Sequence, residues 1–99
     1  MARKIILVTA DYDPLRGKVK RLLREIAEEM DIEVEERKED WELLIKHGEK
    51  DELGGFDLPQ VFVEMEDGSI KHVLTRIPLN DRGKLDLEKA RETIVSAIK

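Results

Sequence analysis

Residues 5–30 read IILVTADYDPLRGKVKRLLREIAEEM and hold the two elements around which the fold is built. The first four residues are all apolar, which is typical of a central strand covered on both faces. After a polar break, apolar residues recur with helical spacing at Val19, Leu22, Leu23, Ile26, Ala27 and Met30. We therefore expect a strand, a short loop and a long helix whose apolar face packs on a sheet.

The rest of the chain supplies three further strands and two further helices. The patterns of apolar residues predict them at residues 32–35, 41–47, 61–66, 70–77 and 87–98. The pair Asp67-Gly68 joins the third and fourth strands in a tight antiparallel hairpin. The expected order is β-α-β-α-β-β-α, with a mixed four-stranded sheet flanked by helices. This is an α/β fold in one domain spanning residues 1–99.

Helix ends and helix faces can also be predicted. Asp31 ends the first helix, and Asp40 and Asp86 each precede a helix in the position of a cap. In the short helix of residues 41–47, we expect Trp41, Leu44 and Ile45 to share the buried face, with Trp41 in the core.

Composition limits the chemistry. The 99 residues include no cysteine, which excludes disulfides, zinc-thiolate sites and thiol nucleophiles. The formal net charge is −5, which argues against nucleic-acid binding as the main task. His47 and His72 lack the spacing of paired metal ligands, so no metal site and no cofactor is expected.

Composition also bears on origin and location. Charged residues make up 41% of the chain, and Asn80 and Gln60 are the sole carboxamides, a composition typical of thermophile proteins. A designed protein or a deliberately cysteine-free variant would share it. The first apolar run is too short for a signal peptide or a membrane span, so we expect a cytoplasmic protein without membrane association.

Two short segments carry a resemblance to a known family. Residues 58–63, Leu-Pro-Gln-Val-Phe-Val, followed by the Asp67-Gly68 turn, are similar to the Val-Pro-Gln-Val-Phe segment of glutaredoxins. Residues 23–28, Leu-Arg-Glu-Ile-Ala-Glu, resemble the Leu-Asp-Glu-Ile-Ala segment of thioredoxins. With the element order above, the chain looks like a member of the thioredoxin-like fold family.

The resemblance implies an altered active site. It sets Asp13-Pro14-Leu15-Arg16 where the family has Cys-x-x-Cys, and Tyr12 where thioredoxins keep a tryptophan. It also implies a cis peptide bond before Pro59, facing that loop. Because both sulfurs are missing, we expect no thiol-disulfide exchange. Residues 75–79 differ from the glutamyl-binding segment of glutaredoxins, which argues against glutathione as a ligand.

With thiol chemistry excluded and glutathione disfavoured as a ligand, the resemblance still implies a groove that binds a protein or an extended peptide. The backbone of Leu58 would pair with the ligand by strand addition. The candidate groove residues are Asp11, Tyr12, Asp13, Pro14, Arg16, Leu58 and Pro59. Plainer interpretations stay open, because Asp13-Pro14 is a good helix start and a proline such as Pro59 can simply open a strand.

Other functions are also compatible with the sequence. Arg16, Lys18, Lys20, Arg21 and Arg24 crowd the start of the long helix, so the chain could be a scaffold or complex subunit that uses this basic face or a sheet edge. The same residues could form a solvated face through pairs such as Arg21 with Glu25. An enzyme using Asp11 and Asp13 as an acid/base pair, or a designed domain without native activity, are further alternatives.

Overall fold

The computed structural model describes residues 1–99, and its element order is the predicted one. The elements are β1 (Ala2–Thr9), α1 (Arg16–Met30), β2 (Glu33–Lys38), α2 (Trp41–His47), β3 (Gln60–Met65), β4 (Ile70–Thr75) and α3 (Leu87–Ile98). The α/β class, the mixed four-stranded sheet and the three helices are therefore confirmed.

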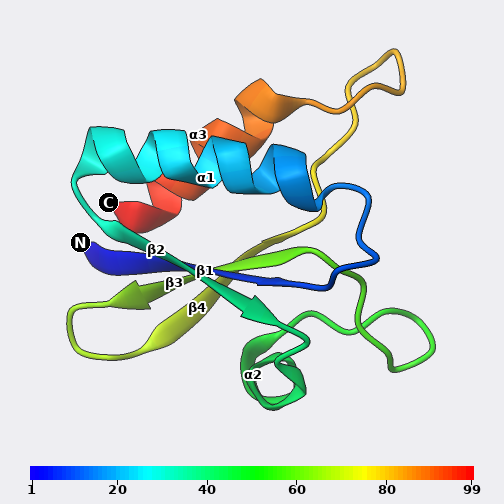
Figure 1. Ribbon diagram of the computed structural model, residues 1–99, viewed down its shortest axis with the longest axis horizontal. Coiled ribbons are helices and arrows are strands. Elements are labelled where there is room, and N and C mark those ends of the chain that lie inside the picture. Colours follow the sequence, from blue (N-terminus) through cyan, green and yellow to red (C-terminus); the bar gives the residue numbers. More distant parts are fainter.

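The sheet has the strand order β2-β1-β3-β4. Strands β1 and β2 run parallel, whereas β3 is antiparallel to both β1 and β4. Figure 1 shows α1 and α3 together on one face of the sheet and α2 on the other. The sheet is thus the middle layer of three, and β1 is one of its two central strands.

Alternation along β1 divides the core in two. Ile5 and Leu7 belong to a cluster of 14 buried residues under α1 and α3. Ile6 and Val8 point to the opposite face, into a cluster of 5 buried residues under α2. Because successive side chains of a strand alternate between faces, a continuous apolar run is what this central position requires.

The helix ends follow from local chemistry. The carboxylates of Asp40 and Asp86 accept hydrogen bonds from the backbone N–H groups of Leu43 (3.0 Å) and Lys89 (2.9 Å), as capping residues do. At the end of α1, Asp31 adopts a left-handed conformation with φ of 55°. All three predicted ends are therefore confirmed.

The predicted packing of α2 is wrong in part. Leu43 and Leu44 are buried, whereas Trp41 is 43% exposed and Ile45 is 67% exposed. A helix of two turns can bury only one narrow strip against a sheet. Here that strip faces Ile6 and its neighbours, and residues 41 and 45, one turn apart, share the outer side.

Some element limits also differ from the predictions. Strand β1 extends to Ala2 and Thr9, and β2 extends to Lys38, beyond the apolar residues that signalled them. Ala2 pairs with Met65 of the antiparallel strand β3, and Thr9 pairs with Lys38 of the parallel strand β2, so backbone pairing carries both strands beyond their apolar residues. Helix α1 begins at Arg16 rather than at Pro14.

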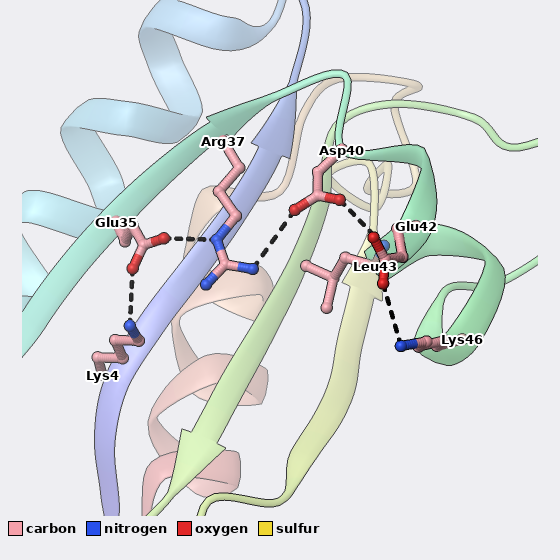
Figure 2. A network of polar contacts seen from close by, with 7 residues as sticks. All are labelled: Lys4, Glu35, Arg37, Asp40, Glu42, Leu43 and Lys46. Atoms are coloured by element: carbon pink, nitrogen blue, oxygen red, sulfur yellow. Dashed lines mark hydrogen bonds and ion pairs between the residues drawn. The ribbon is translucent and has the colours of Figure 1, made fainter.

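A chain of polar contacts links β1, β2 and the start of α2 on the face that α2 covers (Figure 2). Glu35 pairs with Lys4 Nζ at 2.7 Å and with the Arg37 guanidinium. Arg37 Nη1 also lies 3.4 Å from Asp40 Oδ2, while Asp40 Oδ1 caps α2 through Leu43. These contacts cover the part of the sheet that the short helix does not reach.

No helix of this protein has the length and apolar composition needed to span a bilayer.

Candidate binding groove

The predicted groove residues leave one end of the sheet. Strand β1 ends where the antiparallel strand β3 begins, with Val8 opposite Gln60. The loop that follows β1 and the Leu58-Pro59 pair that precedes β3 therefore emerge side by side, as the course of the chain in Figure 1 shows. The topology thus brings together two segments that lie more than 40 residues apart in the sequence.

Asp13 is the one buried acid of this loop, with 8% of its surface exposed. Its Oδ2 accepts a hydrogen bond from Thr9 Oγ1 (3.0 Å), and its Oδ1 accepts one from the backbone N–H of Leu15 (2.9 Å). The carboxylate therefore holds the turn before α1 in place. Asp13-Pro14 is not the start of the helix, because Leu15 occupies the cap position of α1 and provides no side-chain cap.

The neighbouring loop residues point to solvent. Tyr12 is 71% exposed, and Pro14 is exposed as well. Asp11 forms an ion pair with Lys38 Nζ at 2.9 Å, and this contact lowers the pKa of the Asp11 carboxyl. An acid/base pair would need one of the two carboxyls to have a raised pKa. The lowered pKa keeps Asp11 ionised, so Asp11 could serve in such a pair only as the base.

Arg16 is held by the protein itself. Its guanidinium donates two hydrogen bonds to Glu36 on β2, at 2.8 and 3.0 Å. Lys20 Nζ lies 3.4 Å from the same carboxylate. Hydrogen bonding to Arg16 lowers the pKa of Glu36, so the carboxylate stays ionised and offsets the unfavourable charge at the start of α1. Arg16 thus faces β2 and is not a free cation of the groove.

Leu58 and Pro59, just before β3, form only some of the hydrogen bonds that their backbone groups allow. The Leu58–Pro59 peptide bond is cis, as the sequence resemblance implies. Pro59 is buried, and its C=O accepts a hydrogen bond from the N–H of Arg76 (2.8 Å). Leu58 packs against the smaller core, but neither its N–H nor its C=O forms a hydrogen bond within the chain. Two backbone groups are therefore left for another partner.

No cavity forms at this end of the sheet. The four cavities of the surface are lined by other residues, and none includes any of the seven predicted groove residues. A ligand here would lie along the surface between Tyr12 and Leu58. Strand addition needs an exposed backbone edge and no enclosed pocket.

Two residues that support this region were not predicted from the sequence. Gln60 is fully buried. Its side-chain oxygen accepts a hydrogen bond from the backbone N–H of Glu49, and its side-chain nitrogen donates to the C=O groups of Glu49 and Asp57. Arg76 has a left-handed backbone with φ of 61°, uncommon for a residue with a side chain. In the sequence, the one sign of a special role for Gln60 is that it is the only glutamine of a chain rich in charged residues.

No group of three or more histidine, aspartate or glutamate side chains is arranged to hold a metal ion. His72 is half-buried at the hairpin, where its ring meets that of Phe62 edge to face and its Nε2 lies 2.8 Å from Thr75 Oγ1. Burial lowers the pKa of His72.

Comparison of the chain with family models, with curated proteins and with solved structures gives no match.

Proposed function

We propose that this chain is a redox-inactive protein of the thioredoxin/glutaredoxin-like class that binds an extended peptide segment of a partner protein. The class is supported by the element order, the sheet order β2-β1-β3-β4 and the short segments that resemble the family. The absence of cysteine removes the family's thiol chemistry and leaves its binding surface.

The observation that carries the proposal is the unpartnered backbone of Leu58. Buried backbone N–H and C=O groups are nearly always hydrogen-bonded within the protein or to ordered water, and groups at the surface stay available to water or to a partner. Those of Leu58 have no partner in the chain, although the next residue, Pro59, is bonded to Arg76. An extended peptide could accept one hydrogen bond and donate the other, as a strand does at a sheet edge.

The side chains around Leu58 have distinct roles in this proposal. Tyr12 presents a largely exposed aromatic ring that can cover the bound segment, and tyrosine is enriched among residues that dominate interfaces. Asp13 supports the loop from below, because both of its oxygens are already bonded within the chain. A ligand would therefore contact Tyr12 and Leu58 directly and Asp13 only through the loop.

The test is selection of linear peptides from a displayed library, followed by titration of the selected peptide into the ¹⁵N-labelled protein. The Leu58 amide should shift on binding, and Tyr12→Ala should weaken the affinity at least about tenfold. Ile45→Ala is a matched control, because Ile45 is exposed to a similar degree but lies on α2. Peptides that bind equally well to the Tyr12→Ala variant, or shift only residues of α1, would contradict the groove and favour the scaffold alternative.

Membership of the class can be tested separately. The backbone N–H of Arg16 bonds to the C=O of Asp13 (3.3 Å), so the two residues span one turn, within about 7 Å. The double variant Asp13→Cys, Arg16→Cys should therefore form a disulfide and reduce a protein disulfide in the presence of a thiol reductant. Failure of the two sulfurs to pair in the folded variant would show that the loop does not correspond to Cys-x-x-Cys.

A further inference from the structure

The basic residues at the start of α1 divide into two sets. Arg16 and Lys20 face Glu36 on β2. Lys18 and Arg21 lie on another side of the helix and form no ion pair. They line a cavity of about 600 Å³ between α1 and the connecting segment, residues 76–86, which leads from β4 into α3.

The cavity combines an apolar lining with positive charge. Four leucines contribute to it, namely Leu22 of α1, Leu79 and Leu85 of the connecting segment, and Leu87 of α3. Leu79 and Leu87 are among the few large apolar side chains that the protein leaves exposed. The charged residues of the lining are Lys18, Arg21 and Lys84, and none of its residues is acidic.

The wall formed by the connecting segment is well ordered by its own hydrogen bonds. Leu79 and Leu85 form an isolated antiparallel bridge. Between them, Asn80 donates to the C=O of Lys84 (2.7 Å), and its side-chain oxygen accepts from the N–H groups of Arg82 (2.9 Å) and Lys84 (3.1 Å). The leucines and Lys84 are therefore held on a preformed wall, so little ordering cost would accompany binding.

We propose that this cavity binds a small amphipathic anion, a medium-length alkyl chain that ends in a carboxylate. The chain would cover the exposed leucines, and the carboxylate would meet Arg21 and the two lysines. Three cations without an acid, in a protein with a net charge of −5, give charge complementarity to an anion. The volume lies in the range of small-molecule sites, about 300–1,000 Å³, which favours a small ligand over a macromolecule. This site is separate from the Leu58 groove.

The probe is decanoate, titrated into the ¹⁵N-labelled protein below its micellar concentration. We expect saturable shifts of the Leu22 and Leu85 amides. The double variant Lys18→Ala, Arg21→Ala should weaken binding about tenfold, since each exposed ion pair contributes modestly. Lys50→Ala, Lys99→Ala removes two exposed and unpaired cations elsewhere, and should bind decanoate as the parent protein does.

Related ligands test the role of the alkyl chain and the role of the carboxylate separately. Decyltrimethylammonium, which has the same chain and the opposite charge, should not bind, and acetate, which lacks the chain, should not either. Binding of decanol as tight as that of decanoate would overturn the role of the cations. No saturable shift with decanoate, equal binding by the Lys18→Ala, Arg21→Ala variant, or binding only to anionic lipid vesicles would overturn the site. Because Tyr12→Ala should leave decanoate binding unchanged, this result is independent of the peptide groove.

Discussion

Asp13 and Gln60 hold the two segments of the candidate groove in place by different means. Asp13 joins the end of β1 to the turn before α1, through Thr9 and Leu15. Gln60 joins the start of β3 to the long loop before it. Both side chains are buried polar groups whose hydrogen bonds are satisfied within the chain. Their removal should therefore affect the free energy of unfolding before it affects any ligand.

Asp13→Ala should lower the free energy of unfolding by about 1–2 kcal/mol, because it removes two hydrogen bonds. Asp13→Asn should cost less than about 1 kcal/mol, since its amide oxygen can still accept from Leu15 and the Thr9 hydroxyl can turn to accept from the amide nitrogen. Urea denaturation measures both values. An Asn variant as unstable as the Ala variant would show that the charge of Asp13 matters more than its hydrogen-bond geometry.

Gln60→Met should cost about 3 kcal/mol, because a side chain of similar length leaves three backbone groups of residues 49 and 57 without their partner. Hydrogen exchange at the Glu49 amide should accelerate more than exchange in α1. Glu49→Gln changes the same loop without removing these backbone bonds and serves as the control. A loss of stability below about 1 kcal/mol would mean that water replaces the amide.

At the scale of elements, ion pairs connect neighbouring strands and helices at the rim of the apolar core. Strand β2 is an edge strand with mostly charged residues, and it is tied to β1 through Glu35 and to α1 through Glu36. The pair Arg21 with Glu25, one interpretation of the basic helix face, is not among the ion pairs of the structure. The helix pairs instead with β2 and, through Glu29, with Arg91 of α3.

The Glu35 network (Figure 2) should make stability depend on pH. Hydrogen bonds from Arg37 and Lys4 lower the pKa of Glu35 from 4.5 to about 2. A lowered folded-state pKa means that the stabilisation is complete above pH 4.5 and is lost as the pH falls towards 2. Because the pair is partly exposed, solvent screening limits the effect to about 1 kcal/mol.

Urea denaturation of Glu35→Gln between pH 2 and pH 6 checks this. The variant should be less stable than the parent protein at pH 6 and should approach it near pH 2. Glu33→Gln, on the same strand and without an ion pair, should keep the parent's pH profile. Equal pH profiles for the parent protein and Glu35→Gln would contradict the role of the network.

At the scale of the whole molecule, the two faces of the sheet are unequally covered. The apolar cluster that the sheet forms with α1 and α3 contains 14 buried residues, and the cluster that it forms with α2 contains 5. Burial of apolar surface is the main source of stability, so the α2 layer should be the weaker one. The loop that follows α2 also leads to Leu58, so this layer supports one segment of the candidate groove.

We expect α2 and residues 49–57 to open without global unfolding. Native-state hydrogen exchange in low urea should give lower opening free energies for these amides than for β1, β3 and α1. Leu44→Ala should accelerate exchange chiefly in α2, whereas Ile26→Ala, in the larger core, should accelerate it throughout and cost about 2–5 kcal/mol. Identical opening free energies in both layers would show that the molecule opens as one unit.

The sequence by itself determined the element order, the helix ends at Asp31, Asp40 and Asp86 and the two-sided burial of β1, because these depend on periodicity and capping within a few residues. It also pointed to the two segments that meet at the candidate groove. Only the tertiary structure decided the partners of Arg16, the buried bonds of Gln60, the exposure of Trp41 and the cavity beside Lys18. Each of these depends on which distant residues share a face or an edge, and local patterns carry no information about that.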